Sequence, residues 1–188
     1  MKTKLIIFVI IICISVSGCM SLIGRTSFTY DVTVSPVNGT AIIYVPIAID
    51  EEGGVSGVMD NLAIYSYPNS ALNSSASCEI IDSIHGKALE IITDEPIRIK
   101  NRISQRGRAE LNITLWNETF ENSTGSIWMY VDSSSTAEDI SITFESWYVQ
   151  VVLAYGHGVS ITTEPYLNDV TVLKTGWNTY PVYQRRWG

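Results

Sequence analysis

The alternation of apolar and polar residues constrains the fold of this chain more than any other feature of its sequence. From Ser27 to Val34 every even-numbered residue is apolar, and the residues between them are polar. Successive side chains of a β-strand point to opposite faces, so this period of two predicts a strand with one buried face. Similar strand signals recur at residues 41–49, 78–82, 87–93, 97–103, 109–115, 127–131, 159–163, 170–174 and 179–182.

Helices have little support in this sequence. The spacing of Val55, Val58, Met59 and Leu62 fits a helix, but Gly57 weakens it, so we expect at most one short helix. About ten strands separated by short turn-forming segments are typical of an antiparallel sandwich. No repeat or linker divides the chain. We therefore predict an all-β fold, a single antiparallel β-sandwich of about ten strands.

The segment from Ile140 to Tyr155 is longer than a typical strand, and the phase of its apolar residues changes. Apolar residues occupy even positions up to Phe144 and odd positions from Trp147. One extra residue near Ser146 would produce such a change, as a β-bulge does. Bent strands of this kind often turn the corner between two sheets, and we predict that role for this segment.

The N-terminal region has the layout of an export signal. Lys2 and Lys4 precede an apolar run from Leu5 to Val16, which is shorter than the roughly 20 residues that span a bilayer. The segment Val16-Ser17-Gly18-Cys19 that follows resembles the lipobox of prokaryotic lipoprotein precursors. This resemblance implies cleavage before Cys19, a thioether-linked lipid on its sulfur, and an extracytoplasmic protein anchored to the cell membrane. An ordinary secretory signal or an uncleaved anchor is the alternative.

The expected organisation is a lipoprotein signal peptide over residues 1–18, a lipidated tether over 19–25 and a β-sandwich domain over 26–188. Loss of the signal removes two lysines and no acid, which changes the formal net charge from -7 to -9. Such an acidic surface repels polyanions, so we expect no nucleic-acid partner. Once Cys13 leaves with the signal and Cys19 is alkylated, Cys78 is the one remaining thiol, which excludes an intrachain disulfide.

Five Asn-x-Ser/Thr triplets are candidate sites of N-glycosylation, at Asn38, Asn73, Asn112, Asn117 and Asn122. Ten asparagines in a chain this rich in serine and threonine would give roughly two such triplets by chance. The excess, beside a lipobox, indicates an archaeal surface glycoprotein. The alternative is that Ser/Thr-rich loops generate the triplets without being modified.

Three segments resemble recurrent segments of uncharacterised secreted proteins of methanogenic archaea. They are Tyr44-Val45-Pro46-Ile47, the stretch from Cys78 to Ile91, and Leu173-Lys174-Thr175-Gly176-Trp177-Asn178. That group has no assigned chemistry, so the resemblance implies a secreted protein without implying an activity.

No motif for catalysis or metal binding stands out. His85 and His157 each lie beside glycine in expected turns, without clustered carboxylates, so no metal site is predicted. Paired acids such as Asp50-Glu51-Glu52 and Glu138-Asp139 lie in expected loops, where solvent keeps both groups ionised. The loop from Asp132 to Asp139 lacks the residue order of a dedicated calcium loop. We therefore predict no cofactor and no enzymatic activity, with a glycan hydrolase using loop carboxylates as the remote alternative.

An aromatic group is the first candidate for ligand binding. Trp116, Trp128 and Tyr130 alternate with apolar stripes, so they should face away from the core. They would lie close together if strands 109–115 and 127–131 paired as a hairpin across the 117–126 loop. Exposed aromatic rings can stack on sugar faces, whereas rings covered by a loop would be structural.

A basic group is the second candidate. Arg98, Lys100 and Arg102 would share one strand face, which suits phosphate headgroups or acidic glycans. On the same sheet as the aromatic group, they would add attraction for an anionic polymer. The alternative is a solvated face or pairing with the surplus acids of this chain.

These observations predict a lipid-anchored, glycosylated cell-surface β-sandwich protein with a non-catalytic structural or interaction role in the envelope. Its expected partners are the membrane, through the lipid, and envelope glycans or surface proteins. A carbohydrate-binding module that uses the exposed aromatic face is the alternative.

Overall fold

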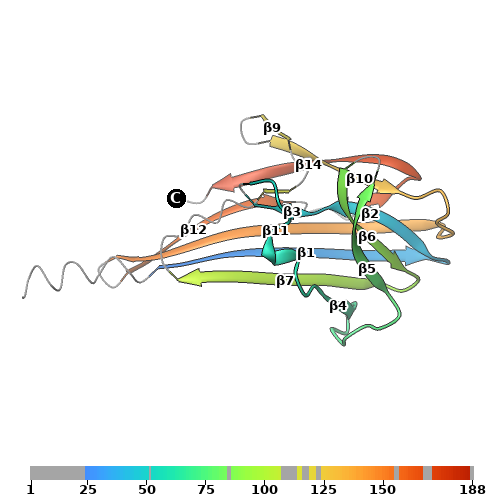
Figure 1. Cartoon of the computed structure of the whole chain (residues 1–188), viewed down its shortest axis with the longest axis horizontal. Coiled ribbons are helices and arrows are strands. Elements are labelled where there is room, and N and C mark those ends of the chain that lie inside the picture. Colours follow the sequence, from blue (N-terminus) through green and yellow to red (C-terminus); the bar gives the residue numbers. More distant parts are fainter. Residues whose placement is uncertain are drawn as a thin grey trace, which may run out of the picture.

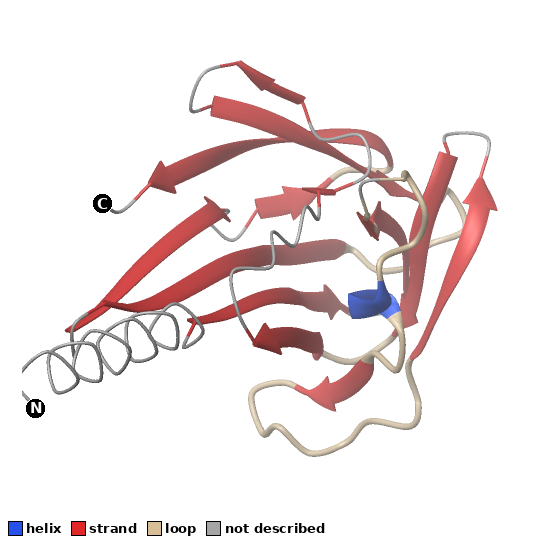
Figure 2. Cartoon of the chain, turned by 60° about the vertical axis from the view of Figure 1, so that its left-hand side comes forward, coloured by secondary structure: helices blue, strands red, loops and turns tan. Residues whose placement is uncertain are grey.

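The computed structural model describes residues 24–50, 52–83, 86–106, 114–115, 119–121, 124–154, 157–166 and 171–186. These residues are almost entirely β-strand, and their one helical element is a single 3₁₀ turn, η2 (Gly57–Met59) (Figure 1, Figure 2). The strands are β1 (Gly24–Val37), β2 (Ala41–Pro46), β3 (Ala48–Ile49), β4 (Ala63–Ser66), β5 (Ser77–Ser83), β6 (Gly86–Thr93), β7 (Ile97–Arg106), β8 (Thr114–Leu115), β9 (Thr119–Glu121), β10 (Thr124–Val131), β11 (Asp139–Ala154), β12 (His157–Tyr166), β13 (Thr171–Leu173) and β14 (Gly176–Arg186).

Two antiparallel five-stranded sheets pack together as a sandwich, which confirms the predicted fold class. The first sheet has the order β4-β7-β1-β11-β12, and the second has the order β14-β10-β2-β6-β5. The two sheets join along one edge because β12 pairs with both β11 and β14. Short strands complete the fold: β3 pairs with β8, β9 with β10, and β13 with β11. In Figure 1, β5 and β6 cross the long strands β1, β7 and β11 steeply.

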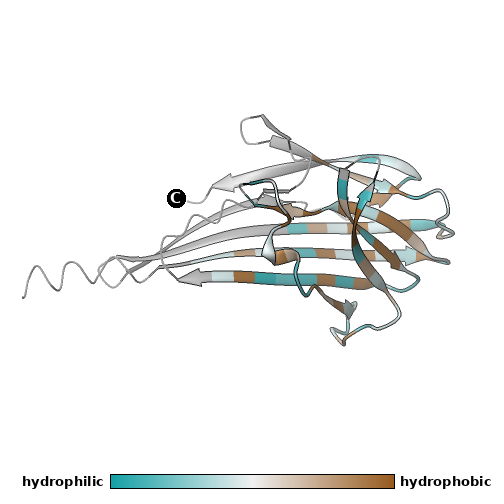
Figure 3. Cartoon of the chain, in the orientation of Figure 1, coloured by the Kyte–Doolittle hydropathy of each residue, from teal (hydrophilic) through white to brown (hydrophobic). Residues whose placement is uncertain are grey.

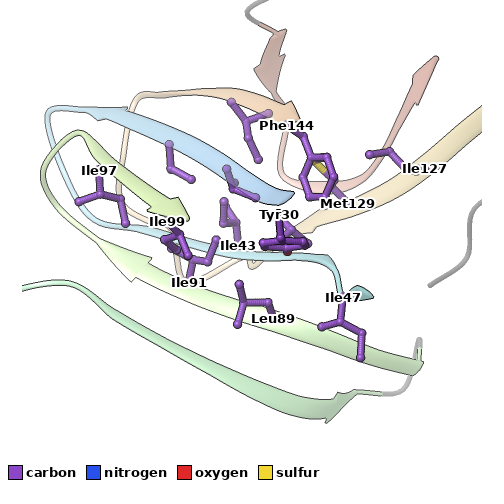
Figure 4. Close-up of a cluster of buried hydrophobic side chains, with 14 of the residues drawn as sticks. Tyr30, Ile43, Ile47, Leu89, Ile91, Ile97, Ile99, Ile127, Met129 and Phe144 are labelled. Atoms are coloured by element: carbon purple, nitrogen blue, oxygen red, sulfur yellow. The ribbon is translucent and has the colours of Figure 1, made fainter. Parts of the chain in front are cut away.

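The alternating stripes predicted from the sequence form the interior between the sheets. Apolar and polar bands alternate along β1 and β7 in Figure 3. The buried apolar side chains of these strands include Phe28, Val32 and Ile99. Tyr30 lies among the buried apolar side chains of the core (Figure 4). Its ring meets that of Phe144 edge to face at a centroid distance of 5.3 Å, and its hydroxyl donates a 2.7 Å hydrogen bond to the carbonyl oxygen of Pro46. This bond satisfies the phenol, so the whole side chain can be buried.

Where the sequence allowed at most one short helix, the described structure has the three-residue 3₁₀ turn η2, which packs against β1 and β7. Val58 and Met59 are buried there, and they belong to the same core cluster. Asn101, at an inward position of β7, donates hydrogen bonds to the carbonyl oxygens of Val58 (2.8 Å) and Asp60 (2.6 Å). These bonds tie the backbone of the turn to the first sheet.

The predicted bulge near Ser146 is wrong. β11 pairs with β1 in one continuous register, from Val152 opposite Gly24 to Asp139 opposite Val37. The sequence beyond Ser146 contains apolar residues at both even and odd positions, so the change of phase does not require an inserted residue. The corner between the sheets is made instead by the pairing of β12 with β14.

The described residues do not form the hairpin between residues 109–115 and 127–131 that would bring Trp116 close to Trp128 and Tyr130. β8 (Thr114–Leu115) pairs with β3, whereas β10 pairs with β9, β14 and β2. β9 is separated from β10 by only two residues, and it pairs with β10 in place of residues 109–115.

β1 begins at Gly24, two residues before the predicted start of the domain at Thr26. The predicted signal peptide and Cys19 lie outside the described residues. Within the residues that are described, no helix has the length and apolar character needed to cross a membrane.

Candidate functional site

The outward face of the second sheet carries a group of four aromatic side chains, which we call the aromatic cluster. Its members are Tyr44 on β2, Trp128 and Tyr130 on β10, and Trp177 on β14. Their neighbours along the strands, such as Ile43 and Met129, point into the core. The strand register brings the cluster together, because Tyr130 lies directly opposite Tyr44 on one side and Trp177 on the other.

The four rings cover one another in part and leave two tryptophans open to solvent. Tyr44 and Tyr130 stack with centroids 5.7 Å apart and planes 24° apart. Trp177 meets Tyr130 at 5.4 Å and Trp128 at 6.1 Å, both in edge-to-face arrangements. Both tyrosines are partly buried, whereas Trp128 is 43% and Trp177 46% exposed. The surface is therefore a pair of exposed indoles supported by two tyrosines, and not a flat platform.

A tight turn positions Trp177 at the start of β14. The side chain of Asn178 accepts a hydrogen bond from the backbone N–H of Lys174 (2.9 Å) and donates to the carbonyl oxygens of Lys174 (2.7 Å) and Gly176 (2.9 Å). Gly176 has φ near +90°, a conformation that favours glycine. These constraints fix the backbone on both sides of Trp177.

Two of the four rings, Trp128 and Tyr130, were predicted from the sequence to face outward, whereas Tyr44 and Trp177 were not among the predicted residues. Tyr44 alternates with buried Ile43 and Val45, so the same argument would have identified it. Trp177 was missed because the predicted strand began at Thr179, three residues after the true start of β14. Trp116 lies outside the described residues.

Two carboxylates, Glu90 and Asp132, border the aromatic cluster, and a third, Glu79, lies one strand further away. Glu90 on β6 lies opposite Tyr44, and Glu79 on β5 lies opposite Glu90. Asp132, just after β10, accepts hydrogen bonds from the hydroxyl (2.5 Å) and backbone N–H (2.8 Å) of Ser134, and these bonds lower its pKa below the ordinary value. The hydroxyl of Tyr44 points at the same carboxylate across 3.4 Å.

Burial and the neighbouring carboxylates both raise the pKa of Tyr44. It is raised from 10.0 to about 12, first by burial of the phenol and then by the negative charges of Asp132 and Glu90. Both causes disfavour a tyrosinate. Tyr44 is therefore neutral and available as a hydrogen-bond donor over the physiological pH range.

The basic group lies on the other sheet, which corrects the expectation that it shares a sheet with the aromatics. Arg98, Lys100 and Arg102 are alternate residues of β7, so they share a strand face as predicted. Arg98 donates two hydrogen bonds to Asp31, 2.8 and 2.6 Å long, and Nζ of Lys100 lies 3.0 Å from the same carboxylate. The bonds to Asp31 raise the pKa of Arg98. Arg102 donates to the hydroxyl of Ser27 at 2.9 Å.

The burial of Asp31 explains why Arg98 and Lys100 lie beside its carboxylate. Its side chain is only 3% exposed although it lies on the outward face of β1. An ionised carboxylate removed from water requires charged partners or several hydrogen bonds. Arg98 and Lys100 thus pair within the chain, which was the alternative to ligand binding.

The loop acids considered for catalysis have separate local contacts. Asp50 accepts hydrogen bonds from the backbone N–H groups of Glu52 and Gly54 in its own turn. Glu95 accepts from Asn73, and Glu138 accepts from Asn38. Among the residues that the structure describes, no group of three or more His, Cys, Asp or Glu side chains is placed to hold a metal ion.

Two of the five candidate glycosylation sites lie in the described part of the chain, and they differ. Asn38 lies in an exposed turn with φ near +50°, and its amide nitrogen donates one hydrogen bond, to Glu138. Asn73 is partly buried, and its amide nitrogen contacts both Ser66 (3.2 Å) and Glu95 (3.4 Å). Its amide oxygen accepts from residues 75 and 76. The sites Asn112, Asn117 and Asn122 lie outside the described residues.

Cys78 packs as a small apolar residue at the border of the core. The side chain is half-buried, and this burial raises the pKa of its thiol. A raised pKa reduces the thiolate fraction, which lowers nucleophilicity at neutral pH.

Trp128 and Trp177 of the aromatic cluster are the largest exposed apolar side chains among the described residues. The exposed indoles, with carboxylates beside the neighbouring tyrosine, form a surface suited to contact with another molecule. Comparison of the chain with protein-family models, with curated proteins and with solved structures gave no match.

Proposed function

We propose that this chain is a non-catalytic, lipid-anchored protein of the cell envelope that binds envelope glycans through the aromatic cluster. The observation that carries the proposal is the pair of exposed indoles, Trp128 and Trp177, on the outward face of the second sheet. Large exposed rings that cluster on one face are typical of surfaces that another molecule covers. Tryptophan is also among the residues that contribute most to binding energy at contact surfaces.

The polar groups around the indoles favour a glycan as the molecule that covers them. Sugar rings present C–H groups to aromatic faces and hydroxyl groups to hydrogen-bonding side chains. The hydroxyl of Tyr44 and the carboxylates of Glu90 and Asp132 border the cluster, and carboxylates accept hydrogen bonds from hydroxyls. A glycan could add its own hydroxyl groups as donors to these carboxylates, which an entirely apolar partner could not do.

The sequence supplies the anchoring part of the proposal. A lipid on Cys19 would attach the domain close to the start of β1, on the outside of the membrane. Two lipid chains hold a protein far more firmly than one, at about 0.8 kcal/mol per buried methylene. Glycans on the candidate asparagines would suit such a location. Cys19→Ser should therefore release the protein from membranes, and unchanged fractionation would exclude the anchor.

Alanine at both tryptophans tests the binding surface. We expect Trp128→Ala/Trp177→Ala to reduce retention on protease-treated envelope material by at least about tenfold, because hot-spot residues each contribute about 2 kcal/mol. Leu72→Ala/Val172→Ala is the matched control, since both residues are exposed apolar side chains outside β2, β10 and β14, the strands that carry the cluster. Retention by this control should be unchanged.

Melting temperatures distinguish a contact surface from a structural one. Substitution of exposed rings should change the melting temperature by only a few degrees. A large fall would show that the rings are needed for folding. Retention that survives the double substitution, or that protease treatment of the envelope abolishes, would contradict the proposed glycan-binding role.

A further inference from the structure

We infer that the glycan bound by the aromatic cluster carries amino groups, so that the protein selects cationic sugars over neutral and acidic ones. This inference rests on the proposed function and specifies its ligand. It starts from a row of outward residues across the second sheet, in which each residue lies opposite the next. The row is Trp177, Tyr130, Tyr44, Glu90 and Glu79.

The row has an aromatic half and an acidic half. Neighbouring strands lie about 4.8 Å apart, so four steps between five strands give a length of roughly 19 Å. A polymer lying along the row would contact several of these residues at once. Its sugar rings would meet the indoles at one end, and its substituents would meet the carboxylates at the other.

The acidic half lacks a basic partner within the described chain. Glu79 and Glu90 lie directly opposite each other, and like charges in that arrangement are destabilising. The outward residues beside them are apolar or uncharged, namely Ser77, Ile81, Ala88 and Ile92. The nearest lysine on β6, Lys87, forms an ion pair with Asp82 at 2.9 Å.

The contrast with Asp31 shows how this chain neutralises acids elsewhere. Asp31 on the first sheet has two cations within 3.0 Å, whereas no ion pair in the described residues involves Glu79 or Glu90. A bound ammonium group would relieve the repulsion between these two glutamates. Asp132, on the other side of Tyr44, adds a third negative charge beside the rings.

Aromatic rings and carboxylates attract the same kind of group. The face of an indole carries partial negative charge and attracts cations within about 6 Å. Uronic acids and sulfated sugars would meet repulsion from all three carboxylates. The arginine and lysine side chains that suit acidic glycans lie on β7, in the other sheet, and two of them pair with Asp31.

Three soluble probes test this selection in calorimetric titrations of the full-length protein in detergent. They are chitosan oligosaccharides, their N-acetylated counterparts and polygalacturonate oligosaccharides. The titrations are run at about pH 6, where most glucosamine amino groups are protonated and the chitosan probe is cationic. We expect chitosan oligosaccharides to bind roughly tenfold more tightly than the N-acetylated ones at low salt, and polygalacturonate not to bind. The preference should shrink as salt screens the charges.

Matched variants assign the preference to the two glutamates. Glu79→Gln/Glu90→Gln should weaken chitosan binding about fivefold and leave binding of the N-acetylated probe unchanged. Asp60→Asn/Asp94→Asn changes the net charge by the same amount at exposed positions outside the row, and it should preserve the preference.

Each contrary outcome overturns the inference. Equal affinity for the two chito-oligosaccharides, tight binding of polygalacturonate, or no effect of the glutamine substitutions would show that the carboxylates do not select the ligand. If no probe binds while envelope retention still depends on the tryptophans, the amino-sugar inference fails and the proposed function stands. The proposed function itself fails only in the retention experiment with the tryptophan variants.

Discussion

Replacement of Asp31 by asparagine tests the conclusion that the basic residues of β7 serve the structure and not a ligand. The substitution keeps the shape of the side chain and removes its charge. It leaves Arg98 and Lys100 facing an amide that can accept hydrogen bonds through only one oxygen. The protein should therefore become less stable, although its core is unchanged.

The structure sets the expected magnitude. Hydrogen bonds to charged groups contribute about 1.5–3 kcal/mol, and breaking a fully buried ion pair costs about 3–5 kcal/mol. Here the carboxylate is 3% exposed, but Arg98 and Lys100 are 36% and 38% exposed. Water can therefore hydrate the two cations and compensate for part of their lost interaction with the carboxylate. We expect Asp31→Asn to lower the free energy of unfolding by about 2–3 kcal/mol.

Urea unfolding with an unchanged m-value measures this loss. Asp82→Asn provides the matched control, because the Asp82–Lys87 pair is exposed, with side-chain exposures of 80% and 41%. Exposed pairs of this kind contribute little, so the control should lose less than about 0.5 kcal/mol. Equal losses in the two variants would refute the reasoning, and Arg98 and Lys100 would again be candidates for ligand binding.

Two further predictions concern Tyr44 and the candidate glycosylation sites. The difference in ultraviolet titration between the parent and Tyr44→Phe should show a tyrosine that ionises at about pH 12. Because the folded-state pKa lies above the ordinary 10.0, the stability that Tyr44 contributes is present below pH 10 and is lost as the pH rises to about 12. Ionisation near pH 10 would contradict the described border of acids. Peptide mapping of native protein should find a glycan on Asn38 in preference to Asn73, whose amide nitrogen would lose a contact to Ser66 or Glu95. Full occupancy of Asn73 would contradict the contacts described for it.

The inward faces of the strands were predictable because alternation is a local property. Phe28, Tyr30 and Val32 alternate with polar residues, so they are expected to share the buried face whichever strands lie beside β1. The identity of the neighbours was not predictable in the same way. The pairing of β8 with β3, and of β10 with β14, depends on contacts between distant segments that no local pattern records.

In the candidate site, too, the local features could be predicted from the sequence, whereas the pairing of distant strands could not. Alternation placed Trp128 and Tyr130 outward, and it placed Arg98 and Lys100 on one strand face. It did not show that these two groups belong to different sheets, since a face of a strand does not specify a sheet. The contacts of Tyr130 with Tyr44 and Trp177 require the register of three strands, so only the folded structure shows the whole cluster.

The place of β1 in the first sheet has a consequence for how the chain folds. β1 is the first strand of the described residues, yet it lies between β7 and β11. Val32 pairs with Ile99 on one side and with Phe144, more than one hundred residues later, on the other. Contacts between residues so distant in sequence slow folding, because a long loop must close before they form. During synthesis from the N-terminus, the edges of β1 stay unpaired until its partners emerge. The earliest strand is thus among the last to be completed, and the unfinished chain is exposed to aggregation for that time.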